Sequence, residues 1–158
     1  MTSSEALEGA RNLLVSCIGV CDGQSVLMVR EAPDTSYYDE LATLIVEDAA
    51  KALGAKVDTI CPALVEDSRD VPEALLEAMT EADHTLFFSQ IGDQVRFVEL
   101  DAQGSKTMCY GLNVDYLSSP MCRVPHALMC DIQQRLVEAL SPGCRWHMTC
   151  GLGTDATG

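Results

Sequence analysis

Residues that could carry catalysis are present in this chain, but their spacing completes no local metal-binding motif. Cys17 and Cys21 lie four residues apart and could share one face of a helix, as two ligands of a metal ion often do. No second pair follows at the spacing of a four-ligand site, and the histidines fall in three separate predicted elements. These histidines are His84, His126 and His147. The sequence therefore predicts no metal site in this chain.

Nucleophilic and acid–base chemistry also lack a local signature. The chain contains no Gly-x-Ser-x-Gly sequence, and none of its eight cysteines stands in a thiol-enzyme motif. Glu66, Asp67 and Asp70 could supply acid or base groups, but such a run of charges is usually a solvated loop. A thiol enzyme that pairs one cysteine with a distant histidine stays open as a third alternative. No catalytic residue is assigned.

A glycine-rich sequence lies near the end of the chain. Residues 151–156, Gly-Leu-Gly-Thr-Asp-Ala, match the Gly-x-Gly-x-x-Ala fingerprint of dinucleotide sites directly after a predicted strand. That fingerprint needs a following helix, whose N-terminus binds the pyrophosphate, and only two residues remain here. We therefore expect no dinucleotide site. A phospho-receiver is not expected either, because the first and third predicted strands end in Arg30-Glu31 and Ser89-Gln90 instead of aspartates.

The elements that would position a site are organised around one strand–helix–strand unit. Ser25–Val29 is a charge-free apolar run typical of a buried strand. Pro33–Ser36 offers an N-cap for a helix over Tyr37–Leu53, which Gly54 ends, and Lys56–Ile60 is the second strand. The unit predicts a right-handed parallel crossover. The expected buried stripe of its helix consists of Leu41, Leu44, Ile45, Asp48, Ala49 and Ala50.

The remaining elements continue the alternation of strands and helices. Residues 93–102 fit either a short helix or a strand, and we predict a helix because it keeps the alternation regular. Gly111–Pro125 is expected to be loop or broken helix. The other predicted helices are Glu5–Val20, Pro72–Ala82 and His126–Leu140, and the other strands are His84–Phe88, Lys106–Tyr110 and Cys144–Cys150.

The sequence thus predicts an α/β fold: a doubly wound (Rossmann-like) five-stranded parallel sheet with helices on both faces. A single domain is expected over residues 1–150, with 151–158 as the start of a second domain or a disordered tail. Ligands of such sheets bind beyond the carboxyl ends of the strands. The corresponding loops are Glu31–Ser36, Cys61–Asp67, Ser89–Asp93 and Gly111–Asp115.

Charge and hydropathy exclude several classes of function. The net charge is −14, and residues 31–83 carry 14 acidic side chains against three basic ones, so nucleic acid is not an expected partner. The acidic face is either a solvated surface or a docking face for a basic partner. The longest apolar run near the start, Asn12–Cys21, is too short to span a membrane, and no signal peptide is expected. We expect a cytoplasmic protein with reduced thiols.

Four stretches together resemble a known family. They are Gly23–Val29, Ala49–Val57, Ala82–Asp83 and Trp146–Asp155. In this order they resemble the N-terminal domain of the aminopeptidase T (leucyl aminopeptidase) metallopeptidase family, to which the iron-dependent 2,5-dihydroxypyridine 5,6-dioxygenases are related.

The resemblance implies half of a metalloenzyme. In the family, the three residues corresponding to Gly153, Thr154 and Asp155 form the junction to a C-terminal domain that holds the metal ligands. This chain would therefore be inactive alone, and it would bind a divalent metal only together with that domain. The resemblance also makes Ser89, Gln90 and Asp93 the substrate-loop candidates, although the dioxygenase branch carries a histidine in this loop. The expected partner is a second domain or subunit, possibly in a homo-oligomer. The alternative is a non-catalytic binding or assembly module that uses the acidic face or the strand-end loops.

Overall fold

The computed structural model describes residues 4–32, 37–96, 98–99, 104–111, 113–143 and 145–158. The chain divides into two compact units, Met1–Pro125 and His126–Gly158. Within the described residues, no helix has both the length and the apolar character needed to cross a membrane.

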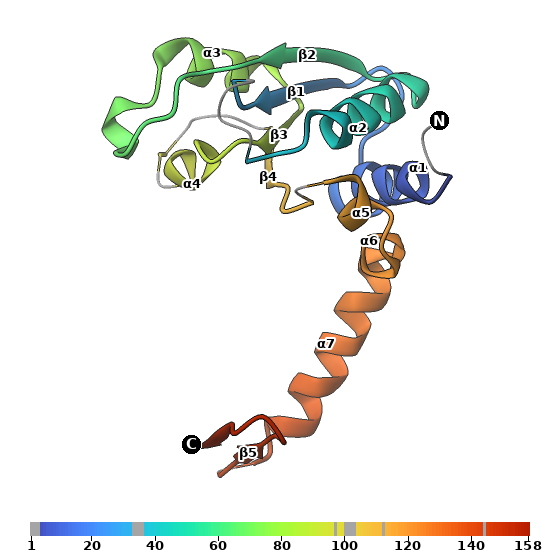
Figure 1. Cartoon of the computed structure of the whole chain (residues 1–158), viewed down its shortest axis with the longest axis vertical. Helices are drawn as coiled ribbons and strands as arrows, with labels where there is room; N and C mark the ends of the chain where they lie inside the picture. The colour runs from blue at the N-terminus through green and yellow to red at the C-terminus, as the bar shows by residue number, and fades with distance from the viewer. Residues whose placement is uncertain (1–3, 33–36, 97, 100–103, 112, 144) are drawn as a thin grey trace. The chain divides into compact units, whose positions relative to one another are not determined.

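A four-stranded parallel sheet forms the centre of the first unit (Figure 1). β1 (Ser25–Arg30) pairs with β2 (Lys56–Ile60) on one side and with β3 (His84–Phe88) on the other. β4 (Ser105–Met108) extends the sheet beyond β3, which gives the order β2-β1-β3-β4. The chain therefore places β2 on one side of β1 and then crosses back to place β3 on the other side. The direction of winding thus reverses at β1.

The two faces of the sheet hold separate apolar clusters because successive residues of a strand point to opposite faces. Val26 and Met28 of β1 belong to the cluster beneath α1 (Ser4–Arg11) and α2 (Glu40–Ala52). Leu27 and Val29 belong to the second cluster, as do residues of α3 (Glu73–Glu81) and α4 (Gly92–Val95). Helices thus cover both faces, as expected. Shorter elements complete this unit: a π-helical segment Asn12–Ile18, a 3₁₀ turn Ser68–Asp70, α5 (Val114–Leu117) and α6 (Pro120–Arg123).

The predicted helix of the central unit forms with a different start and a rotated buried face. Asp39 caps it by accepting the Leu41 N–H at 2.9 Å, whereas the predicted cap at 33–36 falls outside the described residues. The predicted stripe members Leu41, Leu44 and Asp48 are exposed. The helix packs on the sheet and on α1 in one cluster, and small side chains permit this close approach. The buried residues are Ala42, Thr43, Ile45, Val46, Ala49 and Ala50.

The predicted fifth parallel strand is wrong. In the second unit, α7 (His126–Leu140) is followed by β5 (His147–Thr149), which pairs antiparallel with β6 (Asp155–Thr157) in a separate two-stranded sheet. The Cys150 N–H donates to the Thr154 carbonyl at 3.0 Å, and the turn between them includes Gly153 at φ +102°. A glycine adopts this conformation without steric cost, so the local turn competes successfully with long-range pairing to β4.

The helix predicted over residues 93–102 forms only as the single turn α4, which ends at Val95. Arg96, Val98 and Glu99 are not helical, and residues 97 and 100–103 lie outside the described part of the chain. Gly54 ends α2 as expected, at φ +84°.

A reciprocal hydrogen-bonded pair joins β1 to β3 at their amino ends. The Asp83 carboxylate accepts the Ser25 N–H at 2.8 Å and the Ser25 hydroxyl at 2.9 Å, and the Asp83 N–H donates to the Ser25 Oγ at 2.9 Å. The hydrogen bond from the Ser25 N–H, and to a smaller extent the one from the Ser25 hydroxyl, lowers the pKa of Asp83 from its ordinary value of 3.8.

This lowered pKa predicts a pH-dependent stabilisation. A carboxylate whose pKa is lower in the folded state stabilises the fold above its unfolded pKa and loses this contribution as the pH falls through the folded pKa. Asp83→Asn should therefore lower the free energy of unfolding at pH 7, and its difference from wild type should shrink below about pH 4. Urea unfolding at several pH values tests this, with Asp58→Asn on the exposed part of β2 as the control. A difference that does not change with pH would contradict the assignment.

Candidate functional site

A cavity of about 390 Å³ opens at the carboxyl end of β1, where the direction of winding reverses. This is the position at which open parallel sheets usually bind ligands. Two of the four loops predicted from the sequence contribute to it, the loop after β1 and the loop after β2. The lining consists of Arg30, Glu31, Ala32, Tyr38, Asp39, Glu40, Thr43, Cys61 and Phe88. We call this cavity the β1 cleft.

Glu31 ties three segments together at the edge of the β1 cleft. Its Oε1 accepts the Gln90 N–H at 3.0 Å, so the end of β1 is bound to the loop that follows β3. Its Oε2 accepts the Tyr38 N–H at 3.4 Å, which attaches the segment that leads into α2. Main-chain donors thus occupy both oxygens of this carboxylate, and Glu31 acts as a positioning residue.

Tyr38 forms the inner wall of the cleft. Its hydroxyl donates to the Cys109 carbonyl at 2.9 Å, and its ring packs edge-to-face on Phe88 with centroids 6.0 Å apart. Burial raises the pKa of Tyr38 above its ordinary value, and the Cys109 and Glu31 side chains add to this shift. The phenol therefore stays protonated near neutral pH and serves as a hydrogen-bond donor, not as a general base.

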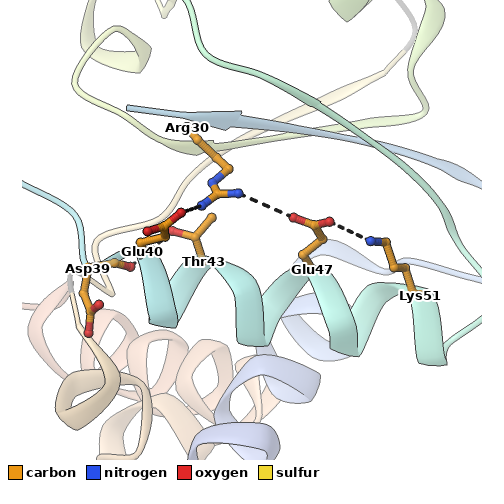
Figure 2. Close-up of polar contacts among 6 residues, drawn as sticks. All are labelled: Arg30, Asp39, Glu40, Thr43, Glu47 and Lys51. Carbon is orange, nitrogen blue, oxygen red and sulfur yellow. Dashed lines mark hydrogen bonds and ion pairs between the residues drawn. The ribbon is translucent and has the colours of Figure 1, made fainter. Parts of the chain in front are cut away.

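Arg30 supplies the positive charge of the β1 cleft and lies along α2 (Figure 2). One guanidinium nitrogen lies 3.1 Å from Glu40, and the other lies 3.9 Å from Glu47, which also pairs with Lys51 at 2.6 Å. The Arg30 side chain is only 18% exposed, so its orientation is fixed by these two carboxylates. The cleft thus presents one oriented cation, several carboxylates and an aromatic wall, a set that can bind a small polar ligand.

The predicted substrate-loop residues have different surroundings. Gln90 is exposed, and its main chain reaches the site through Glu31. Ser89 is fully buried, and its Oγ accepts the Ile91 N–H at 3.4 Å. Asp93 pairs with Arg96 at 3.5 Å. A substrate role for these three residues stays a prediction. Neither Tyr38 nor Arg30 was predicted from the sequence as a residue of the site. The sequence does carry one signal for Arg30, because Glu40, Glu47 and Lys51 recur at helical spacing and form a charged face of the helix.

The predicted domain-junction residues lie in the hairpin of the second unit. Gly153 and Thr154 belong to its turn, and Asp155 begins β6 and bonds His147 Nε2 at 2.5 Å. That these residues lead into a further domain stays a prediction.

The described residues hold no ready group of metal ligands. Within the described residues, no three His, Cys, Asp or Glu side chains lie close enough together to hold an ion. His84, for example, has Ser105 Oγ at 2.8 Å from one ring nitrogen and Gln24 Oε1 at 3.0 Å from the other. We derive no catalytic step through a metal from these residues.

Comparison with known proteins identifies a similar fold. No family model and no curated protein sequence matches the chain, so the resemblance to the aminopeptidase T family stays a prediction. Among solved structures, the 2,5-dihydroxypyridine dioxygenase of Pseudomonas putida KT2440 is similar over 97% of this chain, with a TM-score of 0.50 and 17% sequence identity. The match covers 47% of that enzyme, so this chain spans about half of its length. At this identity the likeness shows the fold alone.

The Tyr38 hydroxyl should contribute measurably to stability because its removal leaves the Cys109 carbonyl unpaired. We expect Tyr38→Phe to lower the free energy of unfolding by about 1–2 kcal/mol. Tyr37→Phe is the matched control, since Tyr37 is exposed and contacts the Tyr38 ring through its own ring. Chemical denaturation of both variants checks this, and equal losses would contradict the role given to the Tyr38 hydroxyl.

Proposed function

We propose that this chain is the α/β domain of a metalloenzyme related to the 2,5-dihydroxypyridine dioxygenase. In this proposal the β1 cleft forms one wall of the substrate site, and a second domain or subunit supplies the divalent metal and its ligands. The observation that carries the proposal is the fold match, which spans 97% of this chain but only 47% of the enzyme. The remainder of that enzyme is the part in which the proposal places the metal site.

The chemistry of the β1 cleft is compatible with such a division of labour. Its residues can bind and orient a ligand, because Arg30 offers fixed N–H donors and Tyr38 and Phe88 offer apolar ring edges. Tyr38 remains a neutral phenol, and both oxygens of Glu31 are occupied by main-chain donors. The described residues of the cleft would thus select and hold a substrate whose chemistry takes place elsewhere.

The proposal predicts that the chain alone has no ring-cleaving activity. With added Fe(II), it should consume neither 2,5-dihydroxypyridine nor oxygen above a protein-free Fe(II) control, because its described residues form no three-ligand group. Absorbance of the ring and an oxygen electrode measure both. Protein-dependent turnover by the isolated chain would contradict the proposal, as would metal-free hydrolysis of aminoacyl substrates.

The concentration of acidic residues favours a second candidate, a non-catalytic module that binds a basic partner. Exposed carboxylates follow one another along β2, the following loop and α3. They are Asp58, Glu66, Asp70, Glu73, Glu77 and Glu81. This function requires binding that weakens steeply with salt, since exposed charges are screened.

A lysine-rich peptide provides the test of this candidate. Its binding at low ionic strength, followed by fluorescence anisotropy, should be lost in a Glu66→Lys/Asp70→Lys variant. The exposed pair Asp131→Lys/Glu138→Lys on α7 is the control with the same change of charge. Equal loss in both variants would show non-specific attraction to an acidic protein and remove this candidate.

A further inference from the structure

Arg30 of the β1 cleft has two carboxylate partners, which differ in how firmly they are held. The Glu47 side chain is 15% exposed and lies 3.9 Å from the guanidinium, and its other oxygen pairs with Lys51 at 2.6 Å. The Glu40 side chain is 69% exposed and contacts Arg30 through one hydrogen bond of 3.1 Å. An ion pair to such an exposed carboxylate contributes little free energy. Glu40 can therefore leave Arg30 at small cost, whereas Glu47 is held from two sides.

The Arg30 guanidinium has hydrogen-bond donors that the protein does not use. Arginine offers several N–H donors in a planar fork, and within the described residues the Arg30 side chain makes one hydrogen bond, the bond to Glu40. The Glu47 oxygen at 3.9 Å is an ion-pair partner beyond hydrogen-bond distance. Because Arg30 lines the β1 cleft, a ligand in the cleft can accept hydrogen bonds from the unused donors.

The other charged residues in the described lining, Glu31 and Asp39, do not compete for Arg30. Both oxygens of Glu31 accept main-chain N–H groups. Asp39 caps α2, and Figure 2 shows its carboxylate turned away from the guanidinium. These two carboxylates make the lining negative, so a further anion is unfavourable while Glu40 stays in place. An anion that replaces Glu40 is different, because the number of carboxylates around Arg30 then stays the same.

The β1 cleft also offers apolar surface for the body of a small ligand. Tyr38 and Phe88 line it together with Ala32, and its volume of about 390 Å³ lies within the range of small-molecule sites. Arg30 would thus bind the charged end of such a ligand, and the aromatic side chains would contact its uncharged part.

We propose that Glu40 is an exchangeable counter-ion of Arg30 and that the β1 cleft selects small organic carboxylates, whose carboxylate group takes the place of Glu40 on the guanidinium. The planar guanidinium binds both oxygens of a carboxylate at once, which a neutral amide of the same shape does not permit. This inference rests on the proposed function in one respect, that the β1 cleft is the ligand site, and it adds the chemical class of the ligand.

Titrations with benzoate and with benzamide test the ligand class, because the two probes have nearly the same shape and differ in charge. Amide shifts of the ¹⁵N-labelled full chain report the binding. Benzoate should shift the Glu31 and Tyr38 amides with a dissociation constant about tenfold lower than that of benzamide. Equal affinity for the two probes would overturn the proposal, as would benzoate shifts that leave both amides unchanged.

The variant Glu40→Gln tests the exchange. It removes the competing charge, so benzoate should bind about threefold to tenfold more tightly, whereas benzamide binding should not change. The matched control is Asp48→Asn, which removes one negative charge from an exposed position of the same helix and should leave both affinities unchanged. Unchanged or weaker benzoate binding by Glu40→Gln would contradict the exchange.

The variant Arg30→Lys tests the guanidinium. It keeps the positive charge but loses the planar fork, so benzoate should bind about tenfold more weakly. Far-UV circular dichroism of all variants confirms that they fold. Benzoate binding that is unaffected by Arg30→Lys would overturn the proposal.

A separate titration with 2,5-dihydroxypyridine distinguishes failure of this inference from failure of the proposed function. Cleft shifts with 2,5-dihydroxypyridine but none with benzoate would overturn the inference and leave the proposed function standing. Benzoate binding that Glu40→Gln strengthens, without any binding of 2,5-dihydroxypyridine, would support the inference and count against the relation to the dioxygenase.

Discussion

The candidate site depends on one carboxylate, that of Glu31. β1 is paired on both edges and buried on both faces, so the residue that follows it has a fixed position relative to the whole sheet. Glu31 extends this order beyond the strand, because its two oxygens bind main-chain donors of Gln90 and Tyr38. Segments that are far apart in the sequence are thereby held around one cleft.

The rest of the site follows from this arrangement. The segment held by Glu31 places Tyr38 against Phe88 and the Cys109 carbonyl, and α2 then begins at its Asp39 cap. The first residue of α2, Glu40, and Glu47 two turns later both face Arg30, which is thereby oriented (Figure 2). The same helix buries its small residues against α1 and the sheet, so helix packing and site geometry depend on one another.

Much of the fold could be predicted from the sequence because its signals are local. Adjacent residues alone indicate β1 and β3 by their apolar runs, the end of α2 by Gly54, and the bounds of α7. The fifth strand could not be predicted, because an apolar segment gives no indication of its pairing partner, and the turn around Gly153 supplied a nearer one. Two of the four predicted strand-end loops line the β1 cleft, and their role in ligand binding stays a prediction. The roles of Tyr38 and Arg30 depend on contacts across the fold, such as that with Cys109, which no sequence periodicity reveals.

The central claim is that the β1 cleft is the ligand-binding surface of a domain that works with a second domain or subunit. Backbone amide shifts of ¹⁵N-labelled protein, followed during titration with 2,5-dihydroxypyridine and without metal, test it most directly. The account predicts saturable shifts at Glu31 and Tyr38, which line the cleft, and at Gln90, whose amide bonds Glu31. Signals from Ser25 and Asp83, at the amino ends of the strands, should not change. Shifts confined to the amino ends of the strands, or none at millimolar ligand, would contradict it.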